Sequence, residues 1–204
     1  MILYIVRHGE TAYNRDGLGL GRADAPLTEL GERQAAAVGR RLGIEPIERI
    51  IASPLGRAAV TARAIAGERP VELRHELLEL DIGETEGLVF AEIHRKYPEF
   101  LQEWMGPHGE HARMPGGESI ADLASRMEPL VTELESLDLP SVAIVSHNFV
   151  SRVLLCRLLG LDLSVYRSFQ VGLASYCTVE LRGGRSIVVN INESCHLDAL
   201  EPPP

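Results

Sequence analysis

The arrangement of short, uninterrupted apolar runs constrains the fold of this chain more than any other feature. Residues 2–6, 50–52 and 142–145 are such runs, and each is followed by a polar turn or loop and then a segment with helical character. Strands that are apolar at every position are typical of a parallel sheet covered on both faces. The sequence therefore predicts an α/β fold with a mainly parallel sheet.

Helices are predicted where apolar or alanine-rich stretches keep helical spacing, over 28–42, 55–66, 119–137 and 150–159. Thr28 is the expected N-cap of the first helix, and Ser119 opens a sequence that resembles a capping box at the third. Residues 176–181 and 186–191 flank Gly183-Gly184 and are predicted to form a hairpin or a pair of edge strands. An edge strand there would allow pairing in a homodimer.

The length of 204 residues fits a single domain, which we expect over residues 1–197. Within it, residues 85–117 are the least regular stretch and are expected to form a variable insert or lid. The last residues, 198–204, end in a run of prolines and are expected to be a disordered tail.

Charge and cysteine content exclude several classes of partner. The formal net charge is −9 and the pI is near 5.3, whereas binding to nucleic acid or an anionic membrane needs a dense positive patch. We therefore expect no nucleic-acid partner and no membrane partner, and an anionic ligand must be held by local charges. The three cysteines form no Cys-x-x-Cys pair, which predicts reduced thiols and a cytoplasmic location.

Polar residues follow the three predicted buried strands at the point where each strand ends. His8 follows the first strand, Ser53 to Arg57 follow the second, and His147 follows the third. Because ligands bind beyond the carboxyl ends of parallel strands, we expect these three segments to converge on one site.

The converging residues match the needs of phosphoryl transfer without a metal ion: a nucleophile, cations for the equatorial oxygens and an acid for the leaving oxygen. His8 can attack phosphorus as a neutral imidazole if its other ring nitrogen donates a hydrogen bond to a nearby backbone carbonyl. Arg7 and Arg57 can fork onto phosphate oxygens, and a protonated His147 would be a third donor.

Glu79 is the expected acid. It lies in an apolar segment, and apolar neighbours would raise the pKa of its carboxyl group. Other carboxylates lie close by in the sequence, so a contribution from Glu84 or Glu86 stays open.

The polar motifs follow one another along nearly the whole chain: Arg7-His8-Gly9-Glu10-Thr11, Asn14, Pro26 to Gly31, Gln34-Ala35, Ser53-Pro54-Leu55, Arg57-Ala58, Thr61-Ala62, Glu79, Gly83, Glu86-Gly87, Pro115 to Ser119, Ser146-His147 and Arg152. In this order they resemble the histidine phosphatase superfamily, in its phosphoglycerate-mutase-like branch. The resemblance implies a three-layer αβα sandwich. It also implies a metal-independent phosphatase that hydrolyses small phosphomonoesters through a phosphohistidine on His8 and needs no cofactor.

The resemblance implies a catalytic set of residues: Arg7, His8, Arg57, Glu79 and His147. We assign substrate binding to a second set: Thr11, Asn14, Leu20, Gly21 and Asn148, the last through its backbone N–H. In the implied reaction Glu79 protonates the leaving alkoxide and then deprotonates the water that releases phosphate.

Two rival functions stay open at this point. The first is a cofactor-dependent phosphoglycerate mutase that uses the same phosphohistidine. Such mutases have a threonine–glycine pair where this chain has Leu20-Gly21, and a long basic insertion that this shorter chain does not contain, so both features favour a phosphatase. The second rival is a non-catalytic phosphate-binding module, which we would expect to have lost His8, Glu79 or His147.

Two histidines in the predicted insert could suggest zinc. His108 and His111 are not accompanied by a Cys or a third ligand in a matching pattern. We expect a solvated loop here and no metal site.

Overall fold

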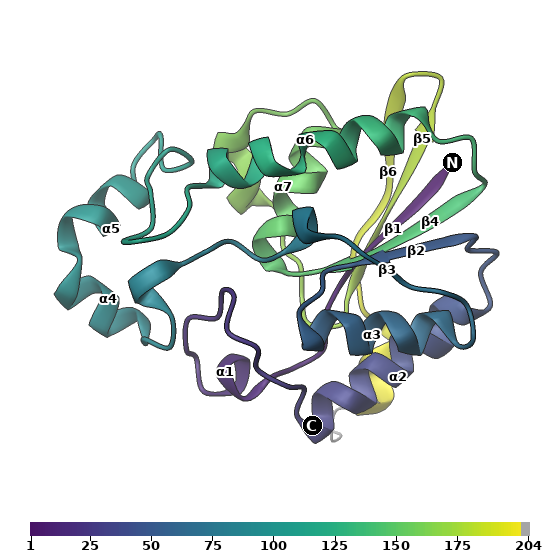
Figure 1. The fold of residues 1–204 in the computed structure, drawn as a ribbon, viewed down its shortest axis with the longest axis horizontal. Coiled ribbons are helices and arrows are strands. Elements are labelled where there is room, and N and C mark those ends of the chain that lie inside the picture. The colour runs from purple at the N-terminus through teal and green to yellow at the C-terminus, as the bar shows by residue number, and fades with distance from the viewer. Residues whose placement is uncertain (201–204) are drawn as a thin grey trace.

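The chain folds around one six-stranded sheet, as the computed structural model shows; it describes residues 1–200 (Figure 1). The strands lie in the order β3-β2-β4-β1-β5-β6. Their bounds are β1 (Ile2–Arg7), β2 (Arg49–Ala52), β3 (Glu72–Leu73), β4 (Ser141–Ser146), β5 (Tyr176–Arg182) and β6 (Arg185–Glu193). The first four strands in this order are parallel to one another. The β5 strand is antiparallel to β1, and β6 is antiparallel to β5. The prediction of a mainly parallel sheet is therefore confirmed.

Helices cover both faces of the sheet, with α2 and α3 on one face and α6 and α7 on the other (Figure 1). The α-helices are α1 (Ala12–Arg15), α2 (Glu29–Gly43), α3 (Gly56–Ala66), α4 (Phe90–Lys96), α5 (Pro98–Trp104), α6 (Ile120–Ser136) and α7 (Asn148–Leu158). Short 3-10 helices are η1 (His75–Leu77), η2 (Gly83–Thr85), η3 (Leu163–Ser168) and η4 (Cys195–Leu200). This is the three-layer αβα sandwich that the family resemblance implies.

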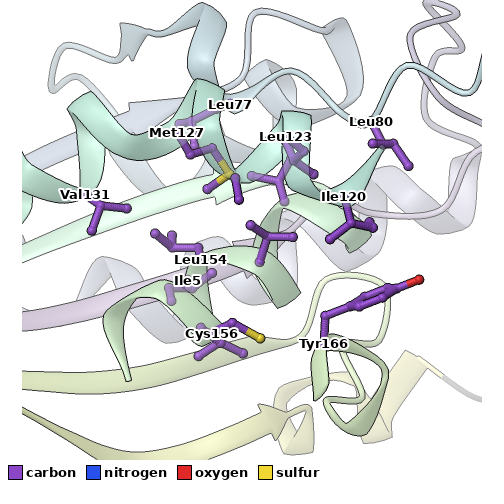
Figure 2. Packing of buried hydrophobic residues seen from close by; sticks show 14 of the residues in the cluster. Ile5, Leu77, Leu80, Ile120, Leu123, Met127, Val131, Leu154, Cys156 and Tyr166 are labelled. Carbon is purple, nitrogen blue, oxygen red and sulfur yellow. The ribbon is translucent and has the colours of Figure 1, made fainter. Parts of the chain in front are cut away.

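Strand β1 lies between two hydrophobic cores. Leu3 and Ile5 belong to the core under α6 and α7, whereas Tyr4 and Val6 belong to the core over α2 and α3. Figure 2 shows the first core, where side chains of α6 and α7 gather around Ile5. Because successive side chains of a strand point to opposite faces, a strand apolar throughout must be covered on both sides.

The predicted helix starts are present. The Thr28 hydroxyl accepts a hydrogen bond from the backbone N–H of Gly31 at 3.0 Å and caps α2. Ser119 and Asp122 form a capping box at the start of α6, with bonds of 3.1 and 2.7 Å in opposite directions. These caps satisfy N–H groups that have no partner within the helix.

Three short elements differ from the expectation. The β3 strand and the α1 helix were not predicted, because two and four residues are too short to display a period. Residues 198–200, which we expected in the tail, lie in η4, so the boundary set at 197 falls inside an element. The other residues of that predicted tail, 201–204, lie outside the described residues.

The predicted insert holds α4 and α5, which lie to one side of the sheet (Figure 1). Its base is tied to the loop after α1: the N–H of Gly19 donates to Leu88 O and the N–H of Gly87 donates to Gly19 O, both at 2.9 Å. Within residues 1–200, no helix is long and apolar enough to cross a membrane.

The β6 strand forms one edge of the sheet and carries exposed apolar side chains. Val189 is 59% exposed and Ile187 is 48% exposed, which is unusual for β-branched residues in a strand. Gly183-Gly184 joins β6 to β5 in the predicted hairpin, with both glycines at positive φ.

Candidate active site

The three predicted segments meet at one edge of the sheet because β2, β4 and β1 are parallel neighbours. The backbone N–H of His8 donates to Ser146 O at 3.0 Å, and the N–H of Ser53 donates to Val145 O at 3.0 Å. These ladder bonds bring the segments after β1 and β2 up to the segment after β4, which begins with His147.

The ring of His8 is held in one orientation. Its Nδ1 lies 2.7 Å from the carbonyl oxygen of Gly9, so Nδ1 carries the hydrogen and Nε2 keeps its lone pair. Burial is the main reason that the pKa of His8 lies well below its ordinary value, with the charges of Arg7 and Arg57 acting in the same direction. The ring is therefore neutral, as the expected nucleophile must be.

Glycine is required next to His8. A Cβ on Gly9 would lie 2.4 Å from the carbonyl oxygen of Gly31 in α2. The loop after β1 can therefore lie against the start of α2 only with glycine at this position.

Arg57 is fully buried and lies against His8. Its Nε donates to Nε2 of His8 at 3.3 Å, while its terminal nitrogens donate to Gly21 O at 2.6 Å and Ala23 O at 2.7 Å. The two terminal nitrogens, which we expected to bind phosphate, thus donate hydrogen bonds to backbone carbonyls. Each of them keeps a second N–H that is still a potential donor.

Arg7 approaches from the end of β1. One terminal nitrogen donates to Val171 O at 2.8 Å, whereas its Nε is buried without a partner among the described residues. Burial lowers the pKa of Arg7 to about 10, which still leaves a cation at neutral pH. A half-buried cation whose buried Nε–H has no partner within residues 1–200 suits an anionic ligand beside His8.

His147 faces His8, with ring centroids 5.1 Å apart. Its Nε2 lies 2.7 Å from the Ser53 hydroxyl oxygen. That oxygen also accepts a hydrogen bond from the backbone N–H of Leu55, so the Ser53 hydroxyl can donate its own hydrogen to Nε2. In that tautomer Nδ1 carries a hydrogen, and Nδ1 is buried with no partner within residues 1–200. Burial, then Arg57, holds the pKa of His147 well below its ordinary value. We expected a protonated donor; a neutral ring can still donate through Nδ1.

Glu79 is buried at the N-terminus of α7. Its carboxylate accepts the backbone N–H of Leu80 at 2.9 Å, of Phe149 at 3.2 Å and of Val150 at 3.4 Å. Burial raises the pKa of Glu79, and the N–H donors oppose that effect. The direction agrees with the expectation for an acid.

The other two acidic candidates are engaged elsewhere. Glu84 accepts a hydrogen bond from the Tyr97 hydroxyl at 2.8 Å. The carboxylate of Glu86 accepts backbone N–H groups from residues 21–23. Glu79 is therefore the best placed of the three.

The backbone of Glu79 is fixed by an ionic network. Arg22 and Arg126 both donate to its carbonyl oxygen, at 3.3 and 3.4 Å. Both arginines also form ion pairs with Glu118, at 2.8 and 3.0 Å. Such a network holds the backbone at Glu79 against α6, which carries Arg126.

The predicted substrate residues divide into two groups. Thr11 is fully buried, and its hydroxyl caps α1 by donating to Asn14 Oδ1 and accepting a hydrogen bond from the Asn14 N–H. Both backbone groups of Gly21 are likewise bound, to Glu86 and to Arg57. The assignments of Thr11 and Gly21 to substrate binding stay predictions.

The other three substrate assignments also stay predictions. Asn14 uses its Oδ1 in the cap of α1, which leaves its amide nitrogen as a donor. Asn148 is the first residue of α7, where N–H groups lack a helical partner. Leu20 is half-buried and brings no polar group to the loop.

Arg152 belongs to the motifs of the family resemblance but has no assigned role there, and its position on α7 is informative. It lies one turn after Asn148 on α7, and its Nε is buried without a partner in the described part of the chain. The Glu79 carboxylate opposes the lowering of the Arg152 pKa that burial causes. The spacing of four residues from Asn148 could have indicated that both share one helix face.

No group of three or more His, Cys, Asp or Glu side chains among residues 1–200 could hold a metal ion. His108 and His111 both approach Glu110, at 3.7 and 3.5 Å, and are exposed.

Known proteins are similar to this chain in sequence and fold. A family model described as the histidine phosphatase superfamily (branch 1) matches residues 3–194. Phosphoserine phosphatase 1 of Hydrogenobacter thermophilus is 34% identical over 199 residues, which are 96% of this chain and 93% of that protein. An α-ribazole phosphatase from Shigella flexneri has a TM-score of 0.87 at 28% identity, covering 95% of this chain and 96% of that one. A mycobacterial glucosyl-3-phosphoglycerate phosphatase with VO3 has a TM-score of 0.82 at 30% identity, covering 95% and 99%.

Proposed function

The chain belongs to branch 1 of the histidine phosphatase superfamily and hydrolyses small phosphomonoesters, and on this premise we propose that the phosphoryl group passes through a covalent bond to His8. One observation carries the proposal: the hydrogen bond from Nδ1 of His8 to Gly9 O leaves the lone pair on Nε2, which faces the fully buried Arg57, while the charge of the half-buried Arg7 also acts on the ring. A neutral imidazole among cations is a nucleophile in an anion site.

In the first step, Nε2 of His8 forms a bond to phosphorus while the bond from phosphorus to the ester oxygen breaks. Glu79, whose pKa is raised, gives its proton to that oxygen. Arg7, Arg57 and the Nδ1 hydrogen of His147 bind the equatorial oxygens, so the proposed step uses no metal ion.

In the second step, water replaces His8 on phosphorus. The Glu79 carboxylate takes a proton from the water, the new oxygen–phosphorus bond forms, and the bond to Nε2 breaks. Inorganic phosphate leaves, and both Glu79 and His8 return to their starting states. A mutase would instead return the phosphoryl group to a bound phosphoglycerate.

A substrate panel tests this function. We expect phosphate release from aryl phosphates, sugar phosphates and phosphoamino acids, and its loss in His8→Ala with the fold intact by circular dichroism. The matched control is His94→Ala, an exposed histidine that should keep full activity. Rapid interconversion of phosphoglycerates with little phosphate release would instead favour the mutase.

For the substrate we propose a phosphomonoester that carries a carboxylate, which Arg152 would bind. The proposal is supported by the Nε of Arg152, which has no partner among residues 1–200, and by its closeness to Glu79, the expected acid. The names of two relatives, a phosphoserine phosphatase and a glucosyl-3-phosphoglycerate phosphatase, refer to substrates of this kind.

Two substrates that differ only by the carboxylate test this class. We expect phosphoserine to have a kcat/KM at least about tenfold above that of phosphoethanolamine, because a charged hydrogen bond is lost with the carboxylate. Arg152→Ala should remove this preference, whereas Arg157→Ala, which breaks a surface ion pair with Glu128, should keep it. Equal kcat/KM values in the wild type would contradict the proposed class.

We further propose a cytoplasmic homodimer. The three free cysteines support a reducing compartment. The exposed apolar centre of β6 supports a second copy as partner, because an antiparallel pairing centred on Val189 would put Arg185 of each copy opposite Glu193 of the other.

A further inference from the structure

The loop that contacts Arg57 is bound from its other side by a carboxylate that the proposed reaction does not use. The backbone N–H of Gly21 donates to Glu86 Oε1 at 2.7 Å, and those of Arg22 and Ala23 donate to Oε2 at 2.9 and 3.2 Å. Three N–H groups that converge on one anion define the conformation of the 21–23 turn.

The same turn holds Arg57 through its carbonyls. Gly21 O and Ala23 O each accept a hydrogen bond from one terminal nitrogen of the guanidinium. The third nitrogen, Nε, donates a hydrogen bond to Nε2 of His8. Because a guanidinium group is planar and rigid, fixing the two terminal nitrogens also fixes the direction of Nε.

Little room exists for the turn to move. A Cβ on Gly21 would lie 2.8 Å from Leu80 O and 3.0 Å from Glu86 Oε2. Glu86 itself follows η2 and donates its N–H to Gly83 O at 3.1 Å, so its backbone is also fixed. The contacts therefore run without a break from Glu86 through the 21–23 turn to Arg57 and His8.

We propose that Glu86 is a positioning residue, which holds Arg57 against His8 by binding the 21–23 turn and so sets the affinity of the site for the phosphoryl group in transit. The proposal rests on the proposed function, in which Arg57 binds that group. Glu86 makes this contribution without touching the substrate, because its carboxylate oxygens are bound to the turn.

Glu86→Gln is the direct test, because glutamine keeps the shape but replaces one acceptor oxygen with an NH2 group that faces backbone N–H donors. We expect kcat/KM for p-nitrophenyl phosphate to fall about tenfold or more, and the inhibition constant of vanadate to rise in parallel. The control is Glu84→Gln, which removes only a contact with Tyr97 and should leave both values unchanged.

A double-mutant cycle with Arg57→Ala separates positioning from a general structural effect. If Glu86 acts through Arg57, Glu86→Gln should lower kcat/KM less than about twofold in the Arg57→Ala background. An equal loss in both backgrounds, or no loss in the wild-type background, would overturn the proposal while leaving the proposed function intact. Arg57→Ala with wild-type turnover would overturn both. If Glu86→Gln does not fold, Glu86→Asp can replace it in the double-mutant cycle, because aspartate keeps the negative charge on a side chain that is one methylene shorter.

Discussion

At His8, burial and hydrogen bonding act together on the imidazole. The Gly9 carbonyl fixes the hydrogen on Nδ1, and burial together with two arginines keeps the ring neutral. Glu79 is buried as well, but burial affects an acid in the opposite sense and favours its protonated form. Burial therefore favours the neutral form of both groups, as the proposed nucleophile and the proposed acid require.

The raised pKa of Glu79 predicts a pH dependence. The acid form is lost as pH rises through that pKa, so kcat/KM for alkyl phosphates such as phosphoserine should fall on the alkaline side. The kcat/KM for p-nitrophenyl phosphate, which has a good leaving group, should fall much less. In Glu79→Gln the alkaline fall should disappear and alkyl phosphates should be slowed far more than aryl ones. Equal losses on both substrates would point to a different acid.

The buried histidines predict a stability effect. The folded-state pKa of His147 lies below the unfolded value of 6.5, so the unfolded state binds more protons as pH falls. The contribution to stability is present above about pH 6.5 and is lost below it, by up to about 1.4 kcal/mol per pH unit. Urea unfolding between pH 7.5 and 5.5 should show a smaller loss for His147→Asn than for the wild type. The exposed control His94→Asn should match the wild type.

At the scale of elements, the caps connect sequence to stability. Ser119 Oγ accepts the Asp122 N–H at 3.1 Å at the start of α6, the longest helix of the described chain. We expect Ser119→Ala to lower the free energy of unfolding by about 1 kcal/mol, because that N–H loses its partner. The exposed Ser125, whose hydroxyl only contacts Ala121 O in the same helix, is the control for urea unfolding. A Ser119→Ala variant as stable as Ser125→Ala would contradict the role of the cap.

The predictability of the elements follows their length and pattern. β1 and α6 were predicted because each buries a continuous apolar face, in one case as a strand and in the other as a helical stripe. β3 was not predicted, since Leu73 is exposed and the strand is defined by backbone pairing with β2 alone. Contacts between distant backbone groups leave no mark on the local sequence.

The site shows the same limit. His8, Arg57 and His147 were predicted to converge from strand ends, because parallel topology brings such ends together. The hydrogen-bond partners of the polar side chains could not be predicted. Arg57 donates to carbonyls of the 21–23 turn, and the Thr11 hydroxyl caps α1. Those bonds depend on how two loops pack, which the residue types alone do not determine.

Across the whole molecule, the net charge is −9, yet the fully buried Arg57 and the half-buried Arg7 act on His8, and we propose that these cations bind phosphate. The expected surface for association is the apolar edge strand β6. We expect the wild type to sediment as a dimer and Val189→Lys, which puts a charge at the centre of β6, to sediment as a monomer with unchanged activity. A monomeric wild type would contradict the proposed pairing.

We propose that the phosphoryl group is covalently bound to His8 during turnover. The most direct measurement is rapid quenching of the enzyme into alkali with ³²P-labelled phosphoserine, followed by peptide mapping. We expect a label that is stable in base, labile in acid and located on His8, and that is absent from His8→Ala. A label on any other side chain, or turnover by the wild type without a labelled enzyme species, would contradict a phosphohistidine on His8.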